Sequence, residues 1–377
     1  MNKKIRYAVV GLGHIAQDAI LPAFKNAKKN SELTALVSGN PKKLKVLGKH
    51  YKVKNLYSYD EYGDCLRSGK IDAVYIALPN DQHRKYTEQA ARAGIHVLCE
   101  KPLSISAQDC QSMIDISKQN KIKLMTAYRL HFEEANLKAV ETVRSGQIGE
   151  PKMFSSLFCM PVKDHNIRLN PRDKGGGPVY DIGIYCLNAA RSIFQSEPID
   201  VTAVSIKSQK EPFKNIEDTV SVIMRFPKEK IATFTCSFDG ASVGNFRVVG
   251  TKGDLFVKNA FDYEGPKYHR LTVGNKAKVT VFKARDHFAP ELLYFSECIL
   301  KNKEPEPSGL EGLADVRIIE AIFASIDSGD SEDTGRTVPV KGILKRDYPT
   351  LDQEKRAPQI KAPNLVDAEE PSGEEAA

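Results

Sequence analysis

The first third of the chain alternates short apolar runs with amphipathic stretches. Each apolar run has the length and β-branched content of a buried strand, at residues 5–10, 33–37, 73–77, 96–99 and 123–126. The stretches between them carry helical patterns, after the first run to about residue 28 and at 43–50, 83–93 and 106–120. Alternating strands and helices predict a parallel, doubly wound sheet that binds its ligand at the carboxyl ends of the strands.

The pattern changes at about Lys152. Apolar residues now alternate with polar or smaller ones, as in Val220, Val222, Met224 and Phe226. This period of two predicts antiparallel strands with one covered face, at 152–158, 201–207, 219–226, 231–238, 246–250 and 255–258. Helical patterns occur at 181–194, 288–301 and 311–327. The free face of so large an open sheet favours a homodimer or homotetramer formed through it.

Composition excludes several classes of protein. The 377 residues allow two domains, and 41% hydrophobic with 27% charged residues is typical of a globular protein. No apolar run approaches the roughly 20 residues of a membrane helix, and Met1 to Ile5 lead into a strand without a signal peptide. We therefore expect a cytoplasmic protein that does not bind membranes.

The cysteines and the net charge indicate neither a metal nor a nucleic acid. The seven cysteines are scattered singly, without metal-ligand spacing, so we interpret them as reduced packing residues. The net charge of +7 can attract anionic small molecules, but no basic motif with interleaved aromatic residues indicates nucleic acid.

A glycine motif follows the first predicted strand. Gly11, Gly13 and Ala16 stand in the order G-x-G-x-x-A, with His14 and Ile15 between, and a helical pattern follows. Such glycines permit a tight turn and close approach of a pyrophosphate, which the helix N-terminus then binds. The motif predicts a dinucleotide site at the start of a Rossmann domain.

The end of the second predicted strand favours NADP over NAD. An NAD site usually presents an acid to the ribose here, but this chain has Ser38, Gly39, Asn40, Lys42 and Lys43. A hydroxyl and two ammonium groups suit a 2′-phosphate. The alternative is that the lysines merely decorate the first turn of a helix, where cations are unfavourable.

Two further strand ends carry candidate residues. Leu78, Pro79, Asn80 and His83 follow the central strand, where Asn80 can cap a helix and His83 can face the ligand or simply pack. Glu100, Lys101 and Pro102 follow the next strand. Lys101 would then lie near the reactive ring of the cofactor, as a proton donor or as a cation that lowers the pKa of a phenol. The alternative is a surface lysine in a turn.

A second cluster begins at three consecutive glycines, Gly175 to Gly177. Asp181 and Tyr185 follow four residues apart, on one face of a predicted helix. A carboxylate and a phenol beside a flexible loop indicate a site. Without the upstream motifs, a capped, half-buried helix start explains the same residues.

These motifs together resemble the Gfo/Idh/MocA family, named for glucose-fructose oxidoreductase, inositol dehydrogenase and rhizopine catabolism. The resemblance runs from Ile5 to about Asp327. Tyr185, where many members have histidine, makes the chain most similar to the glucose-fructose oxidoreductase subgroup. The resemblance implies a Rossmann domain over 1–128 and an α+β domain with a large open, mostly antiparallel sheet over 129–350. The prolines and acidic residues near the end of the chain separately predict a disordered acidic tail over 351–377. A sugar or polyol is expected to bind between the domains.

The resemblance also implies roles for individual residues. Lys101 and Tyr185 are expected to flank the substrate hydroxyl, with Asp181 orienting the sugar and no metal involved. Ser38 and Lys43 are expected to face the 2′-phosphate. The full set expected to bind the cofactor is Gly11, Gly13, His14, Ile15, Ser38, Gly39, Lys43, Tyr59, Leu78, Pro79, Asn80, His83, Glu100, Lys101, Arg129 and Arg168.

The activity that the resemblance implies is hydride transfer between a sugar and NADP. The sugar is either an aldose, oxidised at C1 to the lactone, or a ketose. The chain begins about four residues before its first strand, without the N-terminal arm that helps to lock in the cofactor of glucose-fructose oxidoreductase. An NADP-dependent aldose dehydrogenase or ketose reductase with exchangeable cofactor is therefore the alternative. A non-catalytic NADP-binding regulator and a redox-assisted glycoside hydrolase fit the residues less well.

Overall fold

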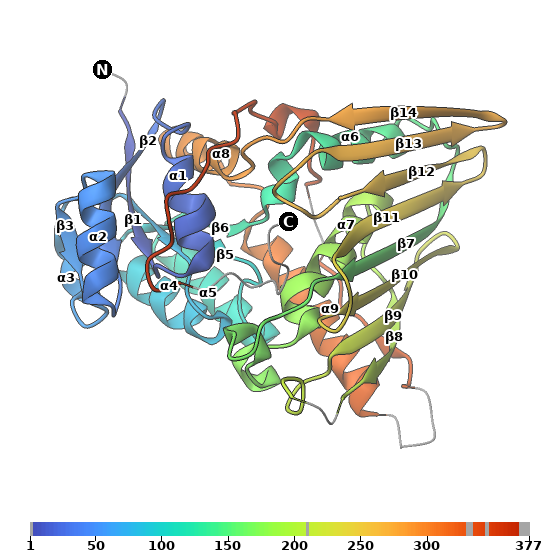
Figure 1. Ribbon diagram of the computed structural model, residues 1–377, viewed down its shortest axis with the longest axis horizontal. Coiled ribbons are helices and arrows are strands. Elements are labelled where there is room, and N and C mark those ends of the chain that lie inside the picture. The colour runs from blue at the N-terminus through green and yellow to red at the C-terminus, as the bar shows by residue number, and fades with distance from the viewer. Residues whose placement is uncertain (1–2, 209–210, 329–334, 344–346, 369–377) are drawn as a thin grey trace. The chain divides into compact units, whose positions relative to one another are not determined.

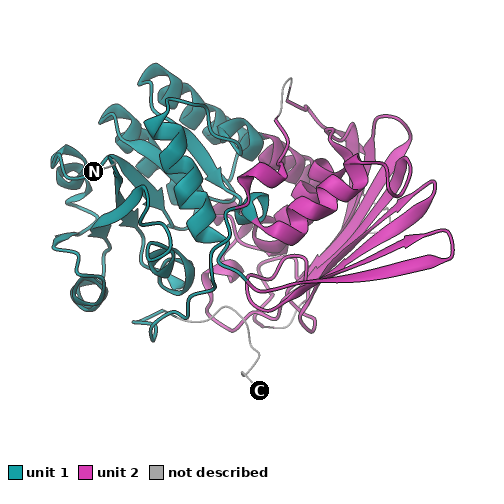
Figure 2. Cartoon of the chain, turned by 90° about the horizontal axis from the view of Figure 1, so that it is seen from above, with its two compact units in different colours: residues 1–132, 285–313, 355–370 teal, residues 133–284, 314–354, 371–377 magenta. Residues whose placement is uncertain are grey.

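The computed structural model describes residues 3–208, 211–328, 335–343 and 347–368. These residues form two compact units, coloured separately in Figure 2. The first unit takes the described residues up to Phe132, then residues 285–313 and the described part of the chain from Lys355. The second takes residues 133–284 and 314–354. The sequence suggested contiguous domains, whereas the chain returns to its first unit twice.

The first unit contains the expected parallel sheet (Figure 1). Its strand order is β3-β2-β1-β4-β5-β6, and all neighbouring strands are parallel. The strands are β1 (Ile5–Val10), β2 (Ser31–Val37), β3 (Asn55–Tyr57), β4 (Ala73–Ile76), β5 (His96–Glu100) and β6 (Leu124–Ala127). Its helices are η1 (Ala16–Ile20), α1 (Leu21–Ala23), α2 (Pro41–Tyr51), α3 (Tyr62–Arg67), η2 (Asn80–Gln82), α4 (His83–Arg92), α5 (Ala107–Gln119), η3 (Arg129–Phe132) and α8 (Phe288–Leu300).

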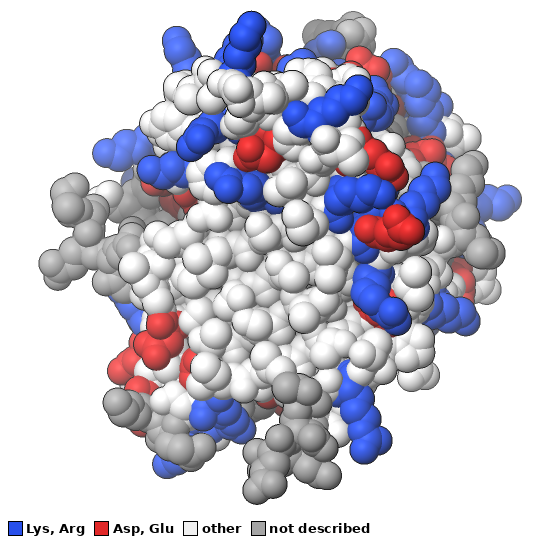
Figure 3. Space-filling model, turned by 90° about the vertical axis from the view of Figure 1, so that its right-hand side faces the viewer, with Lys and Arg blue, Asp and Glu red and all other residues white. Residues whose placement is uncertain are grey.

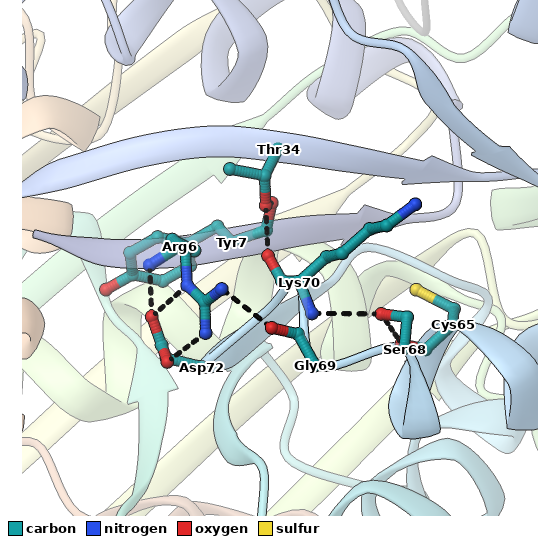
Figure 4. A network of polar contacts seen from close by, with 8 residues as sticks. All are labelled: Arg6, Tyr7, Thr34, Cys65, Ser68, Gly69, Lys70 and Asp72. Atoms are coloured by element: carbon teal, nitrogen blue, oxygen red, sulfur yellow. Dashed lines mark hydrogen bonds and ion pairs between the residues drawn. The ribbon is translucent and has the colours of Figure 1, made fainter.

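Polar contacts hold the amino-terminal end of this sheet, opposite the edge where a ligand is expected. The Arg6 guanidinium donates to both carboxylate oxygens of Asp72 at 2.8 and 2.9 Å, and to the Gly69 carbonyl at 2.7 Å. The Thr34 hydroxyl bridges the carbonyls of Tyr7 and Lys70 (Figure 4). These bonds connect β1, β2 and the loop before β4. They lie away from the carboxyl ends of the strands, where the ligand is expected.

Helix α8 belongs to the first unit, although the sequence placed it in the second domain. The Ser296 hydroxyl on this helix bonds the Tyr7 hydroxyl of β1 at 2.7 Å and the Ser31 hydroxyl of β2 at 2.8 Å. These side chains are buried, so α8 is part of the core that supports the sheet.

The second unit is built on a nine-stranded sheet of order β14-β13-β12-β11-β7-β10-β9-β8-β15. Strands β7 and β10 are parallel, and the other neighbours are antiparallel. Its strands are β7 (Pro151–Cys159), β8 (Asp200–Ile206), β9 (Thr219–Phe226), β10 (Lys230–Ser237), β11 (Val243–Gly250), β12 (Gly253–Lys258), β13 (Lys267–Val273), β14 (Lys276–Phe282) and β15 (Val338–Pro339). The parallel first sheet and the mostly antiparallel second one confirm the predicted fold class.

Helices cover one face of this sheet (Figure 1). They are α6 (Glu134–Arg144), η6 (Val179–Gly183), α7 (Ile184–Phe194) and α9 (Gly309–Asp327), and three short turns are η4 (Ile167–Leu169), η5 (Arg172–Lys174) and η7 (Leu351–Gln353). On β9, Val220, Val222, Met224 and Phe226 are buried beneath the helices, while Ile223 is exposed on the other face. The alternation seen in the sequence therefore separates the covered face from the open one.

The C-terminal segment differs from the expected disordered tail where the structure describes it. Residues 351–353 form the short helix η7, and residues 355–368 lie along the first unit, with an antiparallel bridge between Pro358 and Arg285. Contacts with residues so distant in sequence leave no local pattern, and the composition alone indicated disorder. Residues 369–377 of the predicted tail lie outside the described residues.

Among the described residues, no helix combines the length and the apolar character needed to span a bilayer. The same residues hold no group of three or more His, Cys, Asp or Glu side chains arranged to bind a metal ion. All seven cysteines are free thiols, and all but Cys159 are buried.

Candidate active site

The two glycines of the turn after β1 differ in their surroundings: Gly11 is crowded by a neighbouring loop, and Gly13 faces open space. Gly11 has a φ of +92°, and a Cβ there would lie 2.4 Å from the Ala77 carbonyl oxygen, so the turn after β4 excludes any side chain. A Cβ at Gly13 would meet nothing within 4 Å. His14 and Ile15 are half-buried, and the helix η1 begins directly after them at Ala16. The open side of Gly13 at a helix start fits the approach of a pyrophosphate.

The loop after β2 gathers hydrogen-bonding groups. The Asn40 side chain caps α2 by accepting from the Lys43 amide at 3.1 Å, and the buried Ser38 hydroxyl accepts from the Asn40 amide at 3.2 Å. Tyr59 interacts with the Ser38 side chain and packs against Gly39. Burial lowers the pKa of Lys43, and the nearby Asp367 carboxylate partly offsets this. Ser38, Gly39 and Tyr59 lie together in this loop, close to the start of α2 where Lys43 lies, and their contact with a 2′-phosphate stays a prediction.

His83 braces two strand ends. Its ring is fully buried, with Nε2 2.9 Å from the Leu78 carbonyl oxygen and Nδ1 2.9 Å from the Pro102 carbonyl oxygen. The ring therefore ties the loop after β4 to the loop after β5, and its nitrogens face carbonyls. These contacts agree with the packing role that the sequence left open for His83, and its contact with the cofactor stays a prediction. Leu78 and Asn80 are half-buried and Pro79 is exposed beside it.

Two carboxyl groups lie beside the Tyr75 hydroxyl, that of the half-buried Glu100 and that of the fully buried Glu291. The Tyr75 hydroxyl on β4 donates to Glu100 Oε1 at 2.7 Å and lies 3.4 Å from Glu291 Oε2 on α8. Burial raises the pKa of Glu100, partly opposed by the adjacent Lys101 ammonium. Burial also holds the pKa of Glu291 well above its usual range, and the Glu100 charge raises it further. Glu291 is a residue that sequence reasoning missed, because no local pattern pairs it with β5.

Arg129 belongs to the same buried cluster. It is 6% exposed, and its Nη1 lies 3.2 Å from Nδ1 of His287. Its positive charge lowers the pKa of both Glu100 and Glu291. The positive charge of this predicted cofactor residue thus favours the ionised form of both carboxyl groups, against the larger effect of burial.

In the second unit, Asp181 is held by Arg168. The Arg168 Nε donates to Asp181 Oδ2 at 2.6 Å, and its backbone and guanidinium both bond the Asn166 side chain. Both side chains of the pair keep about a fifth of their surface exposed, 24% for Arg168 and 18% for Asp181. Asp181 lies in the π-helical turn η6, a geometry found at functional sites. The arginine that the sequence assigned to the cofactor therefore fixes the orientation of the candidate carboxylate.

The three glycines before η6 have different roles. A Cβ at Gly176 would lie 1.7 Å from the Asn170 carbonyl oxygen, so this position is filled by the loop's own backbone. Gly177, by contrast, has open space where a side chain would be. The Gly177 amide donates to the Arg168 carbonyl at 2.8 Å, which joins the glycines to the residue that holds Asp181. Gly176 thus shapes the loop rather than a ligand surface.

Tyr185 stands on the first turn of α7 between aromatic rings. Its ring centroid is 5.9 Å from that of Phe158 on β7 and 6.1 Å from that of Phe261. Tyr185 and Asp181 are both half-buried, so they occupy the accessible start of a largely buried helix. The predicted pair thus lies on adjoining turns where η6 leads into α7.

An ionic network that the sequence did not reveal anchors α7. The fully buried Arg191 pairs with Asp315 of α9, and it also bonds Glu197 at 2.7 and 2.9 Å. The Asn188 side chain donates to the other oxygen of Asp315 at 2.7 Å. Because a buried charge is costly unless it is paired, these bonds fix the helix that presents Tyr185.

Two family models match the chain. One, described as an oxidoreductase family with an NAD-binding Rossmann fold, matches residues 5–128. The other, a GFO/IDH/MocA C-terminal domain, matches residues 136–256. They correspond to the parallel sheet of the first unit and to much of the second.

Similar proteins share most of the chain. An NADP(+) D-xylose 1-dehydrogenase of Haloarcula marismortui is 30% identical, over 89% of this chain and 94% of its own. A D-xylose 1-dehydrogenase (NADP(+)) 2 of Haloferax volcanii is 27% identical, over 86% and 98%. The crystal structure of an aldose-aldose oxidoreductase from Caulobacter crescentus, complexed with glycerol, superposes with a TM-score of 0.84 at 36% identity, over 90% of this chain and all of that one. The protein described here belongs to the Gfo/Idh/MocA family of oxidoreductases.

Proposed function

We propose that the protein is an NADP-dependent sugar oxidoreductase of the glucose-fructose oxidoreductase type. It would transfer hydride between a sugar and the nicotinamide. The sugar would be either an aldose, which is oxidised at C1 to the lactone, or a ketose. The observation that carries the proposal is the presence of Lys101, Asp181 and Tyr185 in a chain similar over most of its length to an aldose-aldose oxidoreductase and to NADP-dependent xylose dehydrogenases.

The residues of the first unit fit NADP. The turn at Gly11 and Gly13 would take the pyrophosphate, and Ser38, Asn40 and Lys43 offer a hydroxyl, an amide and an ammonium to the 2′-phosphate. No acidic side chain of the loop 38–43 opposes that phosphate. When bound, the nicotinamide supplies the site that accepts or returns the hydride.

The protein's own residues would handle the proton of the sugar hydroxyl. A phenol with a pKa of about 10 needs a nearby cation to act as a base near neutrality. We propose Tyr185 as the acid/base and Lys101 as that cation, both acting on the reacting hydroxyl. Asp181, oriented by its bond to Arg168, would accept hydrogen bonds from the sugar.

The test is a substrate panel. The purified protein is mixed with NADP and a series of aldoses, or with NADPH and ketoses and lactones, and the absorbance of NADPH is followed. We expect turnover with at least one aldose or ketose and a preference for NADP over NAD. A chain that binds NADP but turns over no member of the panel would remove the proposed activity.

Exchangeable cofactor is the second candidate, favoured by the relatives named as NADP(+) dehydrogenases. A dehydrogenase must release NADPH after each turnover, whereas an enzyme that couples two sugars can retain it. The absorbance spectrum of the purified protein separates the two. Co-purified NADP(H) favours coupling of two sugars, and a protein that requires added NADP is an ordinary dehydrogenase.

We also propose that the open face of the nine-stranded sheet joins a second copy. This face exposes Met153 and Leu157 on β7, Ile223 on β9 and Ile231 on β10, with Met153 and Ile231 paired side by side. Figure 3 shows a broad area without charged side chains there, bordered by lysines, arginines and acidic residues. So large an apolar patch with a polar rim is typical of a protein interface.

A further inference from the structure

The C-terminal segment returns to the first unit and follows a defined course along it. The Asp286 amide donates to the Ala357 carbonyl at 3.1 Å, and the Asn26 side chain donates to the Pro358 carbonyl at 2.8 Å. In Figure 1 this red segment runs beside α1 towards the start of α2. The segment therefore crosses the helix that follows the glycine turn and reaches the loop after β2.

Gln17 ties this segment to the glycine turn. Its side chain is 1% exposed, and its amide nitrogen donates to the Leu12 carbonyl at 2.9 Å and to the Val366 carbonyl at 3.0 Å. Its amide oxygen accepts from the Val366 backbone at 2.8 Å. One buried side chain thus holds both the turn between Gly11 and Gly13 and the backbone at residue 366.

The next residue, Asp367, takes the polar groups at the end of β2. Its carboxylate accepts from the Lys42 ammonium at 2.6 Å and from the Asn40 side-chain amide at 3.2 Å. These two hydrogen bonds lower the pKa of Asp367, so the group is an anion near neutrality. The Lys42 and Asp367 side chains are 66% and 37% exposed, so solvent and solutes reach the pair.

We propose that Asp367 affects the choice between dinucleotides by competing with the 2′-phosphate of NADP for the Lys42 ammonium and the Asn40 side-chain amide. Residues 364–367 are then a displaceable strap over the adenosine end of the site. A carboxylate and a phosphate of the same sign repel one another at one cation, so NADP must move Asp367 aside. NAD lacks the 2′-phosphate and leaves the strap in place. This inference rests on the proposed NADP function.

The variant Asp367→Asn tests the competition. It keeps the size of the side chain and removes its charge, and its amide can still accept from Lys42. We expect the dissociation constant for NADP to fall about threefold to fivefold, the range for an exposed ion pair, and that for NAD to change by less than twofold. Titration calorimetry on the full chain measures both constants without requiring turnover.

A matched control removes the same charge elsewhere in the unit. Glu32 is exposed near the amino-terminal end of β2, and the Asp367 contacts lie beyond its carboxyl end. Glu32→Gln should leave the ratio of the NADP and NAD constants unchanged. A change equal to that of Asp367→Asn would show a general charge effect and overturn the proposal.

Hydrogen exchange gives a second readout. Displacement of the strap breaks the bond from the Val366 amide to Gln17, so NADP should accelerate exchange of this amide and NAD should not. The proposal is overturned if Asp367→Asn binds NADP equally or more weakly, or if NADP protects the Val366 amide. If neither the native chain nor the variant binds NADP, the proposed dinucleotide function itself fails.

Discussion

At the scale of single residues, the proposed chemistry depends on the phenol of Tyr185 and the ammonium of Lys101. We expect Tyr185→Phe and Lys101→Met each to lower kcat about 100-fold or more, because general acid–base catalysis contributes on this order. NADP affinity should be retained in both. Stopped-flow or steady-state absorbance at saturating NADP measures the change.

Matched variants show whether these losses are specific. Tyr268 on β13 and Lys118 on α5 lie outside both candidate clusters, so Tyr268→Phe and Lys118→Met should keep the native kcat. Full turnover in Tyr185→Phe or Lys101→Met would exclude that residue from proton transfer.

Glu291 gives the protein a pH dependence with a definite sign. Burial, then the charge of Glu100, raise its folded pKa, while Arg129 lowers it and Asp286 raises it slightly. The native state therefore keeps a proton that the unfolded chain loses above pH 4.5. The contribution of Glu291 to the free energy of unfolding is therefore fully present below pH 4.5 and decreases as the pH rises towards the folded pKa. The decrease is at most about 1.4 kcal/mol per pH unit.

The variant Glu291→Gln removes this titration and retains an oxygen that can accept from Tyr75. We expect its free energy of unfolding, measured by urea denaturation between pH 5 and 8, to fall less steeply with pH than that of the native protein. Equal slopes for the two proteins would show that Glu291 is ionised in the folded state.

At the scale of elements, the loop over residues 166–177 matters because it holds the Asp181–Arg168 pair. Gly176→Ala would force a Cβ against the Asn170 carbonyl, and we expect a loss of about 1–3 kcal/mol, the range for overpacking. Gly274 lies in a turn with open space, so Gly274→Ala should cost only the strain of its positive φ, about 1 kcal/mol. Urea denaturation compares them, and a Gly176→Ala protein as stable as the native one would contradict the crowding.

Most of the elements that the sequence predicted are those in which one chemical pattern extends over a whole segment. The buried strands of the parallel sheet and the alternating strands β9 and β10 were found for this reason. Strand β14 was missed because almost all its residues are exposed, and β3 because it has only three residues. Helix α6 was also missed, and nothing in its composition explains this.

The residues of the candidate site also fall into those that the sequence indicated and those that it did not. Residues that follow strand ends or glycines, such as Ser38, Lys101 and Asp181, were predictable because their neighbours in sequence define them. Glu291 and Asp367 were not, since each meets its partner only through folding. The Tyr75–Glu291 contact joins residues 216 apart, and the Lys42–Asp367 pair joins residues 325 apart. A buried partner of this kind leaves no local signal.

At the scale of the whole molecule, the open face of the large sheet should determine oligomeric state. We expect Ile223→Glu to convert an oligomer into monomers, because a charge would lie in the centre of an apolar interface. The isolated fold should lose little stability, since Ile223 is 47% exposed. Light scattering after size exclusion measures the mass, with Val46→Glu on α2 as the control. A native protein that is already monomeric would exclude this interface.

The discontinuity of the first unit affects how the chain can be made. During synthesis, the strands β1 to β6 leave the ribosome long before α8, whose Ser296 completes the buried contacts of Tyr7 and Ser31. Strands β7 to β14 emerge in the interval. The first unit therefore cannot complete its core until most of the second unit has been translated. A fragment of residues 1–132 would lack α8, and the side chains of Tyr7 and Ser31 would lose their contact with Ser296.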